Sequence, residues 1–357
     1  MKATMKNQRT MRLIKKLTAV AYLAVLVGAM SCSSFTEKPF TYQGQKLKGV
    51  SFVAPRDSLS DTCYLPVKKL NAEWVSLMPY GFCEAGSPNF VYGRDNQWKW
   101  WGESPKGVAH CIEMAHGKGL KVMLKPHMWI GHGTFTGHFT LKTEEEWQIF
   151  EKKYGDYLLH FAEIADSTNV DLYCIATEMQ MFVKERPQFW FRIIQEIRQI
   201  YKGPLTYAEN WDSYQQVPFW KELDYVGVDA YFPLSEDRSP DMDALRLGWQ
   251  VHVKGMEKVS RSVQKPILFT EFGYVSSDFA ARRPWESDRS LPENEKLQAE
   301  AYKALFEEVW NREWMAGGFV WKWFPGLSPD RKARDPFSPQ NKHAETVLNH
   351  YFEKLSR

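Results

Sequence analysis

The sequence predicts an α/β fold, a single (β/α)8 TIM barrel over residues 45–357 of a 357-residue chain. From residue 45 onward, short apolar runs alternate with amphipathic segments, which is typical of repeated βα units. The runs are continuously apolar, as parallel strands covered on both faces require. Polar and aromatic residues follow nearly all the runs, where a barrel gathers one site from its loops. The eight runs are 49–53, 74–78, 121–125, 171–176, 205–208, 225–230, 267–270 and 318–321.

The segments between the runs carry the start and stop signals of helices. Ser104 and Pro105 are a capping residue and a first-turn proline, and Gly117 can end the helix that they begin. Thr143 and Glu146 have the spacing of a capping box before a long amphipathic segment. Weaker helical patterns cover 187–201, 242–263, 292–314 and 343–355. The segment 211–224 is short, so we expect one outer helix to be degenerate.

An open, doubly wound sheet is the main alternative for eight parallel strands. The nucleotide-binding version of that sheet has a glycine-rich phosphate turn after its first strand. No such turn follows the run 49–53, and the polar residues at the ends of the runs favour the closed barrel.

Composition limits the function classes. The chain has 46 Lys plus Arg against 43 Asp plus Glu, and the formal charge of +3 argues against nucleic acid as a partner. Phe, Trp and Tyr make up 15% of the residues, including 15 Trp, and sugar rings stack on aromatic faces. No motif implies a cofactor, and a monomer is expected.

The N-terminus has the pattern of a targeting segment. A basic stretch is followed by an apolar run, 17–30, that is too short to span a membrane, which takes about 20 residues. The run ends in Gly-Ala-Met-Ser-Cys, which resembles a bacterial lipobox, although Met30 departs from the usual small residue. We therefore expect a signal peptide over 1–31, lipidation of Cys32 and a tether over 32–44. The protein would then be an exported bacterial lipoprotein, held at a periplasmic or cell-surface membrane; plain secretion and a retained anchor are the alternatives.

Cysteine and histidine positions give no strong metal signal. The four cysteines after Cys32 lack zinc-like spacing, so Cys63 and Cys83 form a disulfide or all four stay free thiols. His127, His132 and His138 share one loop without an acidic residue, so contacts with substrate are favoured over a metal site.

Two glutamates directly follow buried strands. Glu178 comes after the run 171–176 and Glu271 after 267–270, on the fourth and seventh predicted strands. A carboxylate at such a place loses water, which costs several kcal/mol unless the group is paired. Taken singly, each could be a structural carboxylate held by a cation. Together they can flank a glycosidic bond, where one protonates the leaving oxygen and the other attacks the anomeric carbon.

Several short motifs stand at the predicted strand ends in a fixed order. They are Lys-Gly-Val-Ser-Phe at 48–52, Leu-Lys-Pro-His at 124–127, Ala-Thr-Glu at 176–178, Val-Asp-Ala-Tyr at 228–231, Phe-Thr-Glu-Phe-Gly at 269–273 and Trp-Lys-Trp at 321–323. In this order the chain resembles clan A of the glycoside hydrolases, and within it the family 113 β-mannanases. The resemblance implies Glu178 as acid/base, Glu271 as nucleophile, Tyr231 as hydrogen-bond partner of the nucleophile, and Trp321 as a platform under the sugar.

Thr177 departs from the clan, much of which has an asparagine before the acid/base residue. Asn210 is the candidate to contact the sugar 2-hydroxyl instead. Trp98, Trp100 and Trp101 crowd one loop, and at least one of them is expected in a substrate subsite rather than in loop packing. Asp229 is expected to be a structural partner rather than a third catalytic acid. The residues assigned to substrate binding are Lys125, His127, Asn210, Trp211, Tyr231, Trp321, Trp323 and Trp101.

The sequence thus predicts a retaining hydrolase of a β-linked glycan, with an endo-β-1,4-mannanase as the leading expectation. Another clan A β-glycanase, an exo-β-mannosidase, a non-catalytic glycan-binding lipoprotein and a metal-dependent barrel hydrolase are the alternatives. Sugar specificity depends on loop geometry, which the sequence does not show.

Overall fold

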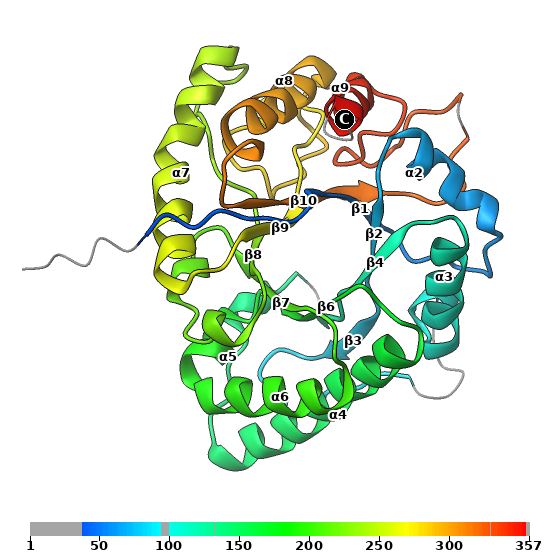
Figure 1. Cartoon of the computed structure of the whole chain (residues 1–357), viewed down its shortest axis with the longest axis vertical. Helices are drawn as coiled ribbons and strands as arrows, with labels where there is room; N and C mark the ends of the chain where they lie inside the picture. The colour runs from blue at the N-terminus through cyan, green and yellow to red at the C-terminus, as the bar shows by residue number, and fades with distance from the viewer. Residues whose placement is uncertain (1–37, 94–99, 132, 329, 355–357) are drawn as a thin grey trace, which may run out of the picture. The chain divides into compact units, whose positions relative to one another are not determined.

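The computed structural model describes residues 38–93, 100–131, 133–328 and 330–354. Eight parallel strands close into a barrel within one compact unit, Phe40–Arg357, and helices surround it (Figure 1). The barrel strands are β1 (Leu47–Phe52), β2 (Trp74–Leu77), β4 (Lys121–Leu124), β6 (Leu172–Thr177), β7 (Leu205–Asn210), β8 (Val226–Asp229), β9 (Ile267–Phe272) and β10 (Met315–Trp323). Their order around the barrel is β1, β10, β9, β8, β7, β6, β4, β2. Each predicted run overlaps one strand, so the predicted fold class is confirmed.

A second, two-stranded parallel sheet extends the barrel at one place, and the sequence did not indicate it. Strands β3 (Tyr80–Cys83) and β5 (His127–Ile130) begin just past the ends of β2 and β4. Pro79 and Pro126 stand at the two breaks, and a proline has no N–H to donate to a strand ladder. Because Tyr80 pairs with His127 in the register of β3 and β5, these two side chains start side by side at the carboxyl end of the barrel.

The helices begin and end largely where the sequence placed them. The Ser104 hydroxyl accepts a hydrogen bond from the Gly107 N–H, and Thr143 and Glu146 form the expected capping box. The helices are α2 (Leu65–Lys69), α3 (Pro105–Gly117), α4 (Glu144–Ser167), α5 (Gln180–Glu185), α6 (Pro187–Ile200), α7 (Met242–Val263), α8 (Glu295–Leu305) and α9 (His343–Lys354).

The outer layer of helices is irregular at two places. Between β7 and β8 there are only two short 3-10 turns, Tyr214–Gln216 and Trp220–Glu222, so the expected degenerate helix is confirmed. The predicted segment 292–314 contains a shorter helix than expected. It begins after Asn294, whose side chain caps it, and a π-helical turn, Phe306–Trp310, follows it.

The core is unusually aromatic. At least seven of the 15 tryptophans are buried, and five of them are among the largest fully buried side chains of the described residues. These five are Trp190, Trp220, Trp249, Trp310 and Trp323. The high tryptophan content therefore serves packing between barrel and helices as much as a surface for sugars, which corrects the interpretation drawn from composition.

The cysteines of the described chain, Cys63, Cys83, Cys111 and Cys174, have free thiols. The Cys83 thiol donates to the Ser87 carbonyl at 3.1 Å, so a disulfide between Cys63 and Cys83 is excluded and the free-thiol alternative holds. Within the described ranges, no three His, Cys, Asp or Glu residues are grouped to hold a metal ion; His132 lies outside these ranges.

The predicted signal peptide, residues 1–31, and Cys32 also lie outside the described residues. Among the helices that the structure describes, none combines the length and the apolar character that crossing a bilayer requires.

Candidate active site

Glu271 stands near the end of β9 with its carboxylate held by two donors. The Lys125 ammonium lies 2.5 Å from Oε1, and the Tyr231 hydroxyl donates to Oε2 at 2.7 Å. His127 Nε2 lies 3.8 Å from Oε1. Hydrogen bonds from a cation and a hydroxyl both stabilise the ionised form of a carboxyl group. Burial and the nearby Asp229 carboxylate raise the pKa of Glu271, and Lys125 and Tyr231 counteract that rise.

Lys125 links Glu271 to a second buried carboxylate, Asp229. Its ammonium donates to both oxygens of Asp229, at 3.0 and 3.3 Å, and Thr270 donates to the same carboxylate at 2.7 Å. Burial disfavours the charge on Lys125, but Asp229 and Glu271 outweigh it and raise the pKa of Lys125. The lysine is 0% exposed, so it supports the site from within instead of touching a sugar, which corrects the sequence assignment. Asp229 is the structural partner that the sequence predicted.

Glu178 directly follows β6, the fourth strand of the barrel, and has a left-handed backbone with φ of 51°. Its N–H donates to the Ala208 carbonyl of β7 at 2.7 Å, which fixes this conformation against the next strand. Burial, then the charges of Asp229 and Glu271, raise the pKa of Glu178 well above its ordinary value. The pKa of both carboxyl groups is raised, but Lys125 and Tyr231 offset part of the rise for Glu271.

A buried network next to Glu178 was not found by sequence reasoning. The Tyr207 hydroxyl accepts from the Met179 N–H at 2.8 Å and donates to Glu209 Oε2 at 2.8 Å. Glu209 is 1% exposed, and its other oxygen accepts from the Ser213 hydroxyl at 2.9 Å. Burial raises the pKa of Glu209 to about 7. The network anchors the peptide that follows Glu178, and its only sequence signal was a Tyr and a Glu at alternate positions of one strand.

Aromatic side chains form a wall beside Glu271. The His127 and Trp321 ring centroids lie 6.3 Å apart with the planes nearly parallel, at 10°, and the Tyr80 ring centroid lies 5.0 Å from that of His127. Burial, then the Lys125 charge, lower the pKa of His127 well below its ordinary value, so the imidazole is neutral. Within the described residues its buried Nε2 has no hydrogen-bond partner, and such a group in a native structure calls for an explanation.

Comparison with known proteins identifies the family of this chain. The model of Glycoside Hydrolase Family 113 matches residues 60–340. The chain belongs to this family. It is therefore a glycoside hydrolase, as the order of its motifs predicted, and its barrel is of the clan A kind. None of the curated proteins with which it was compared matches it.

Solved structures share the fold of this family 113 hydrolase. A family 113 β-mannanase of Alicyclobacillus acidocaldarius, in complex with ManMIm, is 24% identical with a TM-score of 0.76; the match covers 88% of this chain and 99% of that one. A further family 113 β-1,4-mannanase is 24% identical with a TM-score of 0.74, over 87% of this chain and 99% of that one. The chain also matches about half of a Faecalibacterium prausnitzii β-glucuronidase, at 15% identity and a TM-score of 0.56, with 87% of this chain and 49% of that one covered.

The remaining residues that the sequence assigned to substrate binding in this family 113 hydrolase differ in burial. Two lie at the end of β7 and are partly exposed, whereas two others pack in or against the core. Trp211 is half-buried at the end of β7 and stacks on Trp285, with ring centroids 5.6 Å apart. The Asn210 amide beside it donates to Asp212 at 3.0 Å. Trp323, by contrast, is 1% exposed and belongs to the core, so its assignment to substrate binding is wrong. Trp101 packs against the core, 5.1 Å from the His110 ring, and Trp98 lies outside the described residues.

Replacing Tyr207 by Phe tests whether its network positions Glu178. The change leaves the buried Met179 N–H without a partner, which costs roughly 1–3 kcal/mol. If Glu178 is the acid, we expect kcat to fall about tenfold or more on glycosides with poor leaving groups, which need a proton on the leaving oxygen, and much less on glycosides with good ones. Tyr173→Phe is the matched control, because Tyr173 is equally buried on β6 but its hydroxyl donates to the Leu158 carbonyl. Equal losses on both substrates would leave Tyr207 with only a structural role.

Proposed function

We propose that this hydrolase cleaves β-1,4-mannan with retention of configuration, with Glu271 as nucleophile and Glu178 as acid/base. The observation that carries the proposal is the unequal environment of the two carboxyl groups. Lys125 and Tyr231 stabilise the anion of Glu271, whereas no side chain of the described residues donates to Glu178, whose pKa is strongly raised. Double displacement needs two carboxyl groups with different pKa values, one protonated and one ionised at the same pH.

The reaction follows from this assignment. The Glu178 proton passes to the oxygen of the leaving sugar as the Glu271 carboxylate attacks the anomeric carbon and forms a glycosyl ester. Glu178, now ionised, removes a proton from water, which attacks the same carbon and releases Glu271. Direct attack requires the two carboxyl groups to be about 5–5.5 Å apart, whereas inversion requires about 6.5–9.5 Å to hold a water. We predict the shorter separation.

Mannan is proposed as the substrate because solved relatives of the same fold, at 24% identity, include β-mannanases. Mannose differs from glucose in its axial 2-hydroxyl. Two side chains, those of His127 and Asn210, are candidates to form a hydrogen bond with this hydroxyl. Within the described residues His127 Nε2 has no hydrogen-bond partner, and Asn210 is the last residue of β7, the strand next to β6. We propose that one or both of these side chains form a hydrogen bond with the 2-hydroxyl of the mannose unit.

The test combines a substrate screen with product stereochemistry. The protein is incubated with mannan, glucomannan, xylan and β-glucan, and then with mannohexaose, whose first products are followed by NMR. We expect cleavage of mannan at internal linkages, with the β-anomer as the first product. Cleavage confined to xylan or β-glucan would overturn the substrate, release of single terminal mannose units would overturn endo action, and a first α-product would overturn retention.

Tyr231→Phe should move the pH profile in a defined direction. The Tyr231 hydroxyl donates to the ionised form of Glu271, so removing it raises the pKa of Glu271. The acidic limb of the kcat/KM profile should therefore move to higher pH, while the alkaline limb, set by Glu178, stays in place. We expect kcat/KM at the optimum to fall about tenfold to a hundredfold, the usual effect of losing a hydrogen bond to a charged group. An acidic limb that stays in place or moves to lower pH would contradict this role.

We further propose that the protein is anchored by a lipid on Cys32, on the basis of the apolar run that ends there. Cys32→Ala should move the protein from the membrane fraction to the soluble fraction, because the acyl chains supply the attachment. Cys63→Ala is the control, since Cys63 is a free thiol in the barrel domain. A Cys32→Ala protein that stays in the membrane fraction would exclude the lipid anchor.

A further inference from the structure

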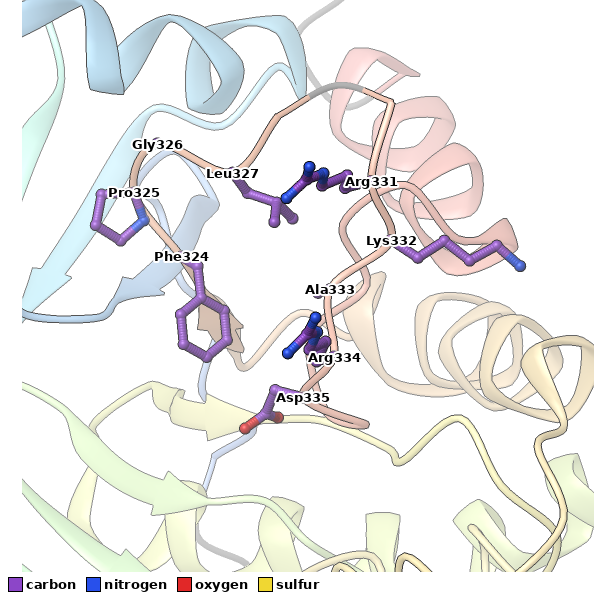
Figure 2. A pocket seen from close by; sticks show the side chains of 9 residues that line it. All are labelled: Phe324, Pro325, Gly326, Leu327, Arg331, Lys332, Ala333, Arg334 and Asp335. Carbon is purple, nitrogen blue, oxygen red and sulfur yellow. The ribbon is translucent and has the colours of Figure 1, made fainter.

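A pocket of 700 Å³ lies beyond the end of β10, in the segment 324–335. Phe324, Pro325 and Leu327 form its apolar side. The opposite side is the segment from Arg331 to Asp335. Figure 2 shows the Arg331 and Arg334 side chains pointing across the pocket toward Leu327 and Phe324, whereas Lys332 points away.

The pocket has a net positive charge. Lys332 forms an ion pair with Glu295, and Asp335 forms one with Lys322 at 3.1 Å, so these charges are balanced. Arg331 and Arg334 are exposed, and in the part of the chain that the structure describes neither has an acidic group within ion-pair distance. Two guanidinium groups without carboxylate partners, facing an aromatic ring, suit an anionic group attached to a ring-shaped ligand.

The pocket and Trp321 belong to one short segment of the chain, at and just past the end of β10. The Lys322 ammonium lies 5.4 Å from the Trp321 ring and 5.6 Å from the Phe324 ring, so it is close to both. Trp321 in turn stacks near His127, which faces Glu271. Phe324 is three residues from Trp321 in the chain, so we infer that a sugar chain lying over Trp321 can extend to Phe324 and the two arginines.

We propose that this pocket binds an anionic group, a carboxylate or a sulfate, carried by the glycan next to the cleaved bond. The inference rests on the proposed function and narrows its substrate class to charged β-linked glycans, which the enzyme prefers to neutral ones. Arg331 and Arg334 bind the anion by paired N–H donors, and Phe324 stacks on the sugar ring that carries it.

The test compares matched substrates. Neutral β-1,4-mannan is compared with the same polymer after oxidation of its C6 hydroxyls to carboxylates, and with a sulfated preparation. We expect kcat/KM about tenfold higher on the carboxylated or the sulfated polymer at low salt, since a charge-assisted hydrogen bond contributes about that factor. The preferred polymer identifies the anion. The preference should shrink at 0.5 M NaCl, where screening is stronger than at about 0.1 M.

The double variant Arg331→Gln and Arg334→Gln should reduce this ratio from about ten to about one. Arg312→Gln is the matched control, because Arg312 precedes β10 and so lies at the opposite end of the same strand. A ratio near one in the wild type, or an equal loss of preference in the control, would overturn the pocket assignment.

The same polymers are also tested for binding by the full-length Glu271→Gln protein, by affinity electrophoresis. This measurement separates the two proposals. Failure to bind or cleave neutral mannan would count against the proposed function. Equal binding of the neutral, carboxylated and sulfated polymers would count against the pocket alone, and tighter binding of a charged polymer that Arg331→Gln and Arg334→Gln abolish would support it whether or not mannan is the natural backbone.

Discussion

Glu271→Ala is expected to lower kcat roughly 10⁵-fold or more, because in the proposed mechanism its carboxylate forms the glycosyl ester. The fold should survive the change, since Lys125 keeps its contact with Asp229 and the buried pair stays balanced. Activity is measured on an aryl β-mannoside with a good leaving group, for which the first step needs no acid. Even this substrate should be nearly inert.

Azide gives the second measurement on Glu271→Ala. A small anion can occupy the space of the lost carboxylate and attack the sugar directly, which yields the α-glycosyl azide by a single inversion. Glu313→Ala is the control, since Glu313 is exposed and precedes β10 at the far end of the barrel. Near-normal turnover without azide would mean that Glu271 is not the nucleophile.

Glu178→Ala is expected to have the second largest effect, and one that depends on the leaving group. Loss of general acid catalysis costs about 10²–10⁴-fold, so mannan and other substrates with poor leaving groups should react that much more slowly. An aryl β-mannoside with a good leaving group should still form the glycosyl ester and then accumulate it, because no base remains to activate water. A burst of the phenol followed by slow turnover is the expected time course.

Azide should restore turnover of Glu178→Ala, because it needs no base to attack the glycosyl ester. Two inversions then give the β-glycosyl azide, the opposite anomer from that expected with Glu271→Ala. The two variants are thus controls for each other. If the anomers were exchanged, the roles of Glu178 and Glu271 would be exchanged as well.

Much of this site could be predicted because its signals are local. Glu178 directly follows β6 and Glu271 stands near the end of β9, and parallel strands of a barrel bring their carboxyl ends to one side. The same rule, with the family resemblance, placed Tyr231 against Glu271, and the 2.7 Å hydrogen bond confirms that contact. Trp321 was placed correctly near the site for the same reason, since it stands near the end of β10 beside His127.

The incorrect assignments to substrate binding, those of Lys125 and Trp323, concern how deeply a side chain is buried. A position at a strand end does not indicate that burial. Lys125 and Trp323 also stand at or just past strand ends, yet both are buried, with exposures of 0% and 1%. Whether such a side chain meets solvent depends on the loops and neighbouring strands that cover it, and those come from distant parts of the chain. Lys125 is buried because its ammonium forms ion pairs with the buried carboxylates of Asp229 and Glu271. These two residues are 104 and 146 positions away in the sequence.

The sequence by itself determined the barrel, its eight strands and the two catalytic candidates, because apolar periodicity, helix caps and strand ends are properties of neighbouring residues. The tertiary structure decided how those candidates differ. The Lys125 ion pair with Glu271, the Tyr231 hydroxyl and the Tyr207 contact with Met179 join residues that are 146, 40 and 28 positions apart in the chain. Acidity and positioning depend on such contacts and on burial, which exist only once the barrel closes.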